Sequence, residues 1–148
     1  MEIRRVTFGE LIALPEWEEL CAQYAEDGGN PEFGCPRVDV GMYTQLEAAG
    51  VLMILAGFDG RRCAGFIGGF ISPQPHFADK PVFAVDALFV DRAHRSSGLG
   101  LRLISGMKRI AKDSGAVGMI FGARIGTKAH KLYSRLFRPM NTLFWKAL

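Results

Sequence analysis

The chain has 148 residues, of which 49% are hydrophobic and 22% charged, and its formal net charge is +3 at pH 7. This composition is typical of a globular protein and excludes extended disorder. The length predicts a single domain over residues 1–148, large enough to form a core without disulfides or metals. The small positive charge, with no run of Lys or Arg, suits an anionic small molecule and does not by itself indicate a nucleic-acid partner.

Cysteine and histidine usage predicts neither disulfides nor a metal site. The three cysteines are odd in number and form no Cys-x-x-Cys pair, and the three histidines share no ligand-like spacing. A reducing cytoplasm is therefore the expected location. No leader peptide or apolar run of membrane length is seen, so we expect no membrane association.

The first half of the chain predicts a strand, two helical segments and a hairpin. Thr7-Phe8-Gly9-Glu10 has the order of a capping box, and apolar residues then recur at helical spacing to Tyr24, with Pro15 placed for a new first turn. Asp39 is the expected cap of a second helix. The predicted elements are a strand over 2–6, helical segments over 7–24 and 40–49, and paired strands over 51–58 and 63–71.

Glycines interrupt the second strand of that hairpin. Gly65, Gly68 and Gly69 lie within residues 63–71, where glycine weakens a strand and marks a bulge or a close approach of another backbone. Pro73 and Pro75 end the strand.

The second half predicts a strand–helix–strand unit. An apolar strand over 82–90, a helix that starts near Leu99 and closes at 113–115, and a strand over 117–123 form a right-handed crossover, so the two strands should be parallel. Thr127 should cap a helix over 128–137, and residues 141–147 predict a closing strand. The expected fold is α/β (α+β): a twisted mixed sheet, mostly antiparallel with one central parallel pair, flanked by about four helices.

The turn between the strand over 82–90 and the helix at Leu99 predicts an anion site. Its sequence is Arg95-Ser96-Ser97-Gly98-Leu99-Gly100, directly before a helix N-terminus, where free N–H groups and the helix dipole favour negative charge. Arg95 adds a cation suited to phosphate oxygens. A P-loop is excluded because Leu101 and Arg102 follow Gly100, and a dinucleotide fingerprint because Leu103 replaces its third glycine.

The motif resembles Arg/Gln-x-x-Gly-x-Gly/Ala, the pyrophosphate loop for coenzyme A in the GNAT superfamily of N-acetyltransferases, over most of the chain. The resemblance implies acetyl-CoA as the acyl donor, no metal, and transfer to the primary amine of a small-molecule or peptide acceptor by direct attack in a ternary complex. It implies that the pyrophosphate meets the loop, and that the pantetheine arm bonds to a strand backbone as an added strand would. The implied cofactor-binding residues are Leu88, Phe89, Val90, Arg95, Ser96, Ser97, Gly98, Leu99, Gly100 and Leu101.

Two side chains are candidates for the proton transfers. Tyr133, in Ala129-His130-Lys131-Leu132-Tyr133, resembles the family's Ala-x-x-x-Tyr, and a phenol of pKa about 10 can protonate a leaving thiolate. Asp86 is the only acid within the strand over 82–90 and is the candidate base; alternation predicts that it shares a face with Leu88 and Val90. A packing role for Tyr133 and a structural role for Asp86 are the alternatives.

Two positions depart from the family pattern. Gly126 stands where many members have an asparagine that binds the pantetheine arm, and Phe137-Arg138 replaces the common Gly-Phe. These departures favour a rival function, a non-catalytic acyl-CoA-binding module; a small nucleic-acid-binding protein is a further rival.

The acceptor and the oligomeric state are open. By the resemblance, the acceptor groove is walled by the two N-terminal helices and their linker, where the candidates are Glu26, Asp27, Glu32 and Arg37. Phe144 and Trp145, on the predicted closing strand, make an edge-paired homodimer a further expectation.

Overall fold

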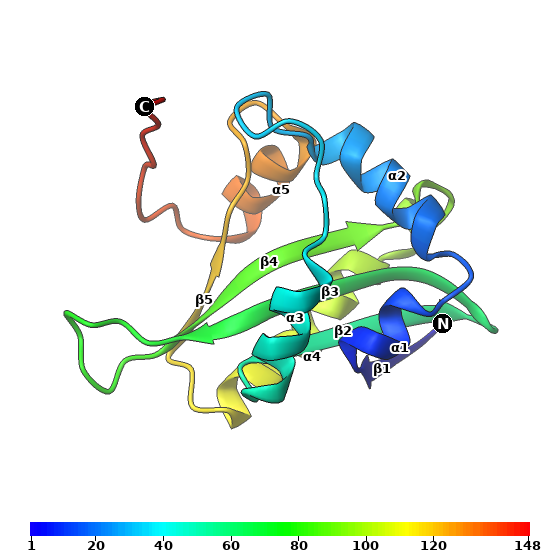
Figure 1. The fold of residues 1–148 in the computed structure, drawn as a ribbon, viewed down its shortest axis with the longest axis horizontal. Coiled ribbons are helices and arrows are strands. Elements are labelled where there is room, and N and C mark those ends of the chain that lie inside the picture. Colours follow the sequence, from blue (N-terminus) through cyan, green and yellow to red (C-terminus); the bar gives the residue numbers. More distant parts are fainter.

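The computed structural model describes all 148 residues and contains a five-stranded sheet in the order β1-β2-β3-β4-β5 (Figure 1). Strands β1 to β4 are antiparallel and β4 runs parallel to β5, which confirms the predicted mixed sheet. The strands are β1 Glu2–Val6, β2 Leu52–Asp59, β3 Arg62–Ser72, β4 Val82–Val90 and β5 Gly118–Phe121. The helices are α1 Phe8–Ile12, α2 Trp17–Gly28, α3 Val40–Ala48, the 3-10 helix η1 Arg92–Ser97, α4 Leu99–Asp113 and α5 Lys128–Leu136.

Local sequence signals set the helix starts. Thr7 and Glu10 form the predicted capping box at α1, each side chain bonding the other's backbone N–H. Asp39 and Thr127 cap α3 and α5 through their side-chain oxygens, as expected. The predicted helical segment over 7–24 is divided into α1 and α2 in the region of Pro15.

The sheet separates two hydrophobic cores. Helices α1, α2 and α3 cover one face, where Phe8, Leu20 and Ile54 are buried, and α4 covers the other, where Leu55 and Leu103 are buried (Figure 1). Successive residues of β2 therefore point into different cores, and because both faces are covered β2 is almost continuously apolar. We call these the acceptor face and the α4 face.

A β-bulge in β4 reverses the predicted orientation of Asp86. Gly68 of β3 pairs with Ala87 and Gly69 pairs with Val85, so Asp86 is the extra residue of the bulge. As a result Asp86 contacts Tyr43 of α3 on the acceptor face. Leu88 and Val90 pack on the α4 face.

The prediction that Asp86 shares a face with Leu88 and Val90 is thus wrong, because the bulge breaks the alternation. The bulge itself was indicated by the glycines of β3. Gly69 is essential to it: a Cβ there would lie 2.2 Å from the Ala84 carbonyl oxygen.

The parallel strands separate after four residues. Pairing between β4 and β5 runs from Val82↔Gly118 to Val85↔Phe121 and stops. The second half of β4 therefore has β3 on one side and no strand on the other. This open edge is the main structural consequence of the short β5.

The predicted closing strand over 141–147 does not form, and residues 138–148 contain no helix or strand. Trp145 instead packs edge-on against Phe33, at 4.8 Å between ring centroids. The short β5 offers little edge for a further strand. The strand over 141–147 through which Phe144 and Trp145 were expected to pair in a dimer is therefore absent from the structure.

No helix in the structure has the length and apolar character needed to cross a bilayer.

We expect Gly69→Ala to lower the free energy of unfolding by about 1–3 kcal/mol, since the added methyl meets the Ala84 carbonyl and β4 must shift. Gly68→Ala is the matched control, because its Cβ would lie 3.5 Å from Ile54 Cγ1 and should change the stability by less than about 1 kcal/mol. Urea unfolding followed by tryptophan fluorescence measures both. Equal free energies of unfolding for the two variants would contradict the close approach of Ala84 to Gly69 at the bulge.

Candidate active site

The open edge of β4 presents backbone groups of Leu88 and Val90. The Asp91 N–H donates to the Ala64 carbonyl of β3 at 2.9 Å, so Asp91 and, two residues earlier, Phe89 face β3. The alternate residues Leu88 and Val90 face the open side. The ring of Phe89 is buried in the acceptor-face core and packs against Tyr24 at 5.9 Å between centroids, so neither its backbone nor its ring faces the open side as the prediction for Phe89 required.

The polar turn after β4 is the 3-10 helix η1, which ends at Gly98. Gly98 has φ of 75°, in the left-handed region that glycine adopts readily, and it is also the N-cap of α4. No atom lies within 4 Å of the position that a Cβ would take there. The loop is therefore open to solvent at Gly98.

The first N–H groups of α4 are partly satisfied by the protein. Leu99 donates to Ser97 Oγ at 3.3 Å and Arg102 to the Gly98 carbonyl at 3.2 Å. Gly100 and Leu101 have no acceptor within the helix. Of the first three N–H groups of α4, only those of Gly100 and Leu101 are therefore left to bind an anion.

The side chain of Leu99 belongs to the core. It is fully buried, and a Cβ on Gly57 would lie 2.5 Å from its Cδ1. This packing fixes the start of α4 against β2. Only the backbone of Leu99 is left for a ligand.

Arg95 points away from the loop amides. Its Nε donates to the Val90 carbonyl at 3.1 Å, its Nη2 pairs with Asp27 at the end of α2, and its guanidinium lies 5.5 Å from the centroid of Phe89. Arg92 pairs with the same Asp27 at 2.8 Å. Hydrogen bonds from Arg92 and Arg95 lower the pKa of Asp27, which keeps it ionised.

Arg95 thus connects α2 to the end of β4, a contact that the sequence did not predict. The sequence assigned Asp27 to the acceptor groove and Arg95 to the loop, and no local pattern joins them, because their pairing depends on the packing of α2.

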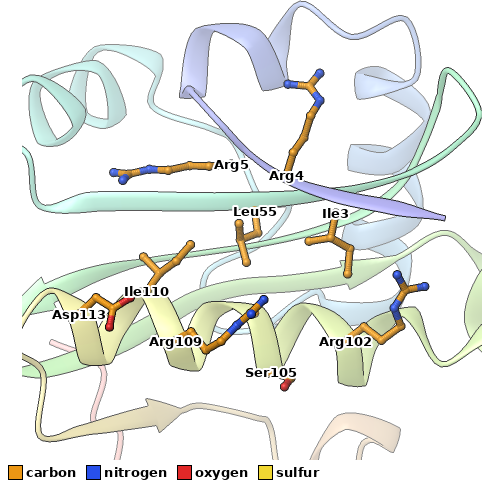
Figure 2. A pocket seen from close by; sticks show the side chains of 10 residues that line it. Ile3, Arg4, Arg5, Leu55, Arg102, Ser105, Arg109, Ile110 and Asp113 are labelled. Atoms are coloured by element: carbon orange, nitrogen blue, oxygen red, sulfur yellow. The ribbon is translucent and has the colours of Figure 1, made fainter.

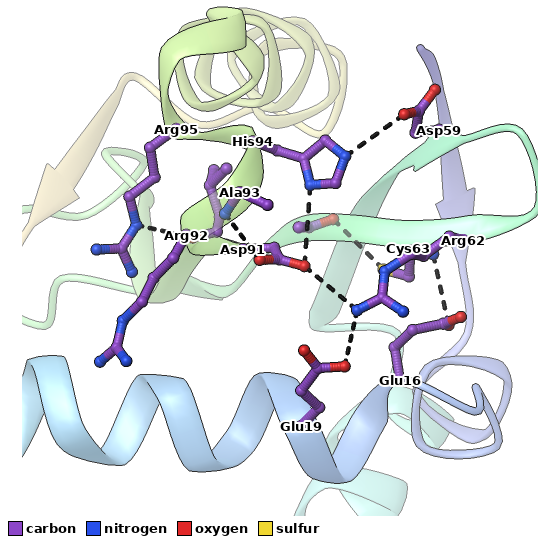
Figure 3. Close-up of polar contacts among 12 residues, drawn as sticks. Glu16, Glu19, Asp59, Arg62, Cys63, Asp91, Arg92, Ala93, His94 and Arg95 are labelled. Atoms are coloured by element: carbon purple, nitrogen blue, oxygen red, sulfur yellow. Dashed lines mark hydrogen bonds and ion pairs between the residues drawn. The ribbon is translucent and has the colours of Figure 1, made fainter.

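Asp91 holds the start of η1 in a polar cluster (Figure 3). It is 3% exposed, and one carboxylate oxygen accepts the Ala93 N–H at 3.0 Å while the other lies 3.5 Å from Arg62 Nη2. His94 Nδ1 lies 3.8 Å from the same carboxylate. Burial acts to raise the pKa of Asp91, but the hydrogen bonds from Ala93, Gln23 and Arg62 and the nearby His94 outweigh it, and the net pKa is lowered.

Asp86 opens into a cavity of about 250 Å³ on the acceptor face. The Tyr43 hydroxyl donates to Asp86 Oδ2, and burial together with this bond raises the pKa of Tyr43. Tyr24 also lines the cavity, and its pKa is raised by burial and then by the charge of Asp86. Both phenols therefore stay protonated beside the carboxylate.

Tyr133 lies on α5 among aromatic rings. Its ring is 5.2 Å from Phe121 of β5 and 5.8 Å from Phe137, measured between centroids. Its hydroxyl makes no hydrogen bond within the protein. Burial, and to a smaller extent Tyr24, raises the pKa of Tyr133, so the phenol keeps its proton.

Gly126 adopts a backbone conformation that glycine and asparagine tolerate. Its φ is 86°, and its N–H donates to His130 Nδ1 at 3.4 Å, just before α5. Compared with the asparagine of many family members, Gly126 keeps the backbone turn but has no side chain that could bind the pantetheine arm.

Among the four acidic and basic candidates for the acceptor groove, only Arg37 lines the cavity. Asp27 and Glu26 are paired with arginines, and the Glu32 N–H donates to the Asn30 side chain in the loop.

A second hollow, of about 630 Å³, lies on the α4 face between β1 and α4 (Figure 2). Arginines surround it, but the Arg4 guanidinium packs 4.5 Å above the Phe58 ring and Arg102 donates to the Met1 carbonyl at 2.9 Å. The sheet separates this hollow from Asp86. We therefore place the candidate active site at the open edge of β4 and the acceptor-face cavity.

No group of three or more His, Cys, Asp or Glu side chains is arranged to hold a metal ion.

The arrangement of sheet, split parallel pair and loop is that of an acetyltransferase fold. The model of the Acetyltransferase (GNAT) family matches residues 14–137. The chain therefore belongs to the GNAT acetyltransferase family. No curated protein sequence matches it significantly.

Solved structures support the fold. An aminoglycoside acetyltransferase from an uncultured soil metagenomic sample superposes with a TM-score of 0.76 at 19% identity, covering 99% of this chain and 97% of that one. A ribosomal-protein-alanine N-acetyltransferase from Brucella melitensis biovar Abortus 2308 gives a TM-score of 0.76 at 19% identity, covering 99% and 96%. AAC(6')-Iy in complex with a bisubstrate analog gives 0.71 at 18% identity, covering 99% and 97%.

We expect Asp91→Asn to lower the free energy of unfolding at pH 7 by about 1–3 kcal/mol, because a buried carboxylate with several donors is replaced. The folded-state pKa of Asp91 is lowered, so its contribution is complete above the unfolded value of about 3.9 and is lost as the pH falls through the folded value. The difference between wild type and variant should therefore shrink in acid. Chemical unfolding at several pH values measures it.

The control is Asp113→Asn, an exposed acid without a hydrogen bond, which should change the stability at pH 7 by less than about 0.5 kcal/mol. A difference for Asp91→Asn that stays constant below pH 4 would contradict the role given to its charge.

Proposed function

We propose that residues 1–148 act as one acetyltransferase domain that moves an acetyl group from acetyl-CoA to a primary amine by direct attack in a ternary complex. The observation that carries this proposal is the end of β4–β5 pairing at Val85 and Phe121. It leaves the Leu88 backbone and the Val90 N–H without a strand partner between the loop at Gly98 and the cavity at Asp86, while the Val90 carbonyl accepts from Arg95.

The chain's donors fit a coenzyme with an extended arm and a diphosphate. In the proposed complex the backbone of Leu88 and the N–H of Val90 hold the arm as an added strand would, while Phe89 supports the strand from the core. The diphosphate meets the amides of the loop and first turn, with Ser96 and Ser97 nearby; the loop residues are Arg95, Ser96, Ser97, Gly98, Leu99, Gly100 and Leu101. AAC(6')-Iy, a fold neighbour, has been solved with CoA.

Arg95 has a positioning role in this proposal. With its Nε on the Val90 carbonyl and its Nη2 on Asp27, it orients the end of the open edge.

Each proton has a place to go. Acetyl-CoA supplies a thioester, whose C–S bond breaks as the amine nitrogen forms the C–N bond. Tyr133 donates its proton to the leaving sulfur, a role that suits a phenol whose pKa is raised by burial. The acceptor arrives as an ammonium, and Asp86 takes one proton from it, directly or through a water, so that the neutral amine attacks, while Tyr43 fixes the carboxylate. The second nitrogen proton, lost as the amide forms, returns through solvent to Tyr133, so that one proton is released overall.

A non-catalytic acyl-CoA-binding module is the second candidate. Gly126 favours it, because no side chain is present there to bind the arm. The two functions differ in whether an amine is consumed.

The direct test follows free thiol released from acetyl-CoA in the presence of a panel of primary amines, with coenzyme A binding measured by calorimetry. An acetyltransferase gives amine-dependent thiol release above hydrolysis and an acetylated product by mass spectrometry. Binding heat without amine-dependent release indicates the module. Absence of binding heat rejects both.

Tyr133→Phe should reduce kcat by about 10²–10⁴-fold, because the general acid is removed while the ring and its packing remain. Coenzyme A affinity measured by calorimetry should stay within about twofold of wild type. A variant with unchanged kcat would remove Tyr133 from the mechanism, and one that also loses coenzyme binding would indicate a packing role.

A further inference from the structure

The cavity beside Asp86 has mostly apolar walls. It is bounded by α1, α2, α3, the linker residues 36–38, the start of β2 and the middle of β3 and β4, and its apolar lining includes Phe8, Leu11, Trp17, Leu52, Ile54 and Phe66. Its volume of about 250 Å³ is below the ~300–1,000 Å³ of pockets for drug-sized ligands. An acceptor that enters it must be small and must present carbon surface.

Asp86 is the only carboxylate that lines this cavity. One of its oxygens accepts the Tyr43 hydroxyl, and the carboxylate carries one negative charge with lone pairs left for further donors. A single ammonium group can therefore be neutralised here.

Two other acids near this face are already engaged by the protein. Asp27 is held by Arg92 and Arg95, and Glu47 accepts the backbone N–H of Phe8 at 2.7 Å. Arg37, which lines the same cavity, adds positive charge. A second ammonium on the acceptor would meet apolar walls or a cation, and burying an unpaired charge is strongly unfavourable.

We propose that the acceptor is a monoamine: a primary amine on a small, uncharged, apolar body, with its one ammonium group at Asp86 and its body in the cavity. The inference rests on the proposed acetyl transfer and adds the substrate class. It sets this chain apart from the fold neighbour described as an aminoglycoside acetyltransferase.

Hexylamine and hexamethylenediamine form a matched pair of probes, since they share chain length and nucleophile and differ by one ammonium group. With acetyl-CoA and the full chain, kcat/KM should be about 10²-fold higher for hexylamine. From propylamine to hexylamine, kcat/KM should rise about fourfold per added methylene, as each is transferred from water to the cavity.

A rim substitution tests the charge argument. Val38 lines the cavity and is 42% exposed, so Val38→Asp adds a second carboxylate with little effect on the core. It should raise the ratio of kcat/KM for hexamethylenediamine to kcat/KM for hexylamine about two- to fivefold. Val40→Asp, at a residue 50% exposed and outside the lining, is the matched control and should not change the ratio.

Failure of this inference is distinguishable from failure of the proposed function. If the diamine or an aminoglycoside is acetylated as well as hexylamine, or if kcat/KM does not depend on chain length, the monoamine inference is wrong and acetyl transfer stands. If a peptide N-terminus is preferred over every alkylamine, the inference is likewise overturned. If no amine releases thiol, both are rejected.

Discussion

The site depends on one constraint, the incomplete pairing of β4. Over Val82–Val85 the strand has partners on both sides, and after Val85 it keeps only β3. Unpaired backbone groups in a sheet favour the addition of another extended chain. The same strand carries the bulge that turns Asp86 toward the acceptor face. The proposed donor and acceptor sites therefore meet along β4.

Charge pairing connects the N-terminal helices to this strand. Asp27 at the end of α2 binds Arg92 and Arg95 of η1, and Asp91 binds the start of η1 and Arg62 of β3. The lowered pKa values of both acids indicate that their charged forms are stabilised by the fold. The loop before α4 is thereby held by groups that do not belong to the anion motif itself.

The acceptor face differs chemically from the loop. Around η1 the side chains are polar and charged, with Arg92 and Arg95 paired to acids of α2, whereas the cavity next to Asp86 is lined mainly by aromatic and aliphatic side chains. A polyanionic donor and a largely apolar acceptor would thus approach through surfaces of different character. The GNAT fold supplies the polar loop, and side chains of α1, α2 and α3 determine the apolar character of the cavity.

The sequence by itself determined the order and type of most elements, the helix caps at Thr7, Asp39 and Thr127, the parallel pair and the glycine turn at 98. These depend on local propensity, periodicity and capping, which neighbouring residues decide. The closing strand over 141–147, the side-chain direction of Asp86 and the partner of Arg95 were decided only by the tertiary structure. A strand needs a partner edge, a bulge moves each later side chain to the opposite face, and an arginine pairs with whichever carboxylate the packing of a distant helix brings near. Asp27 and Arg95 are 68 residues apart in sequence, and only the docking of α2 against the end of β4 brings them into contact.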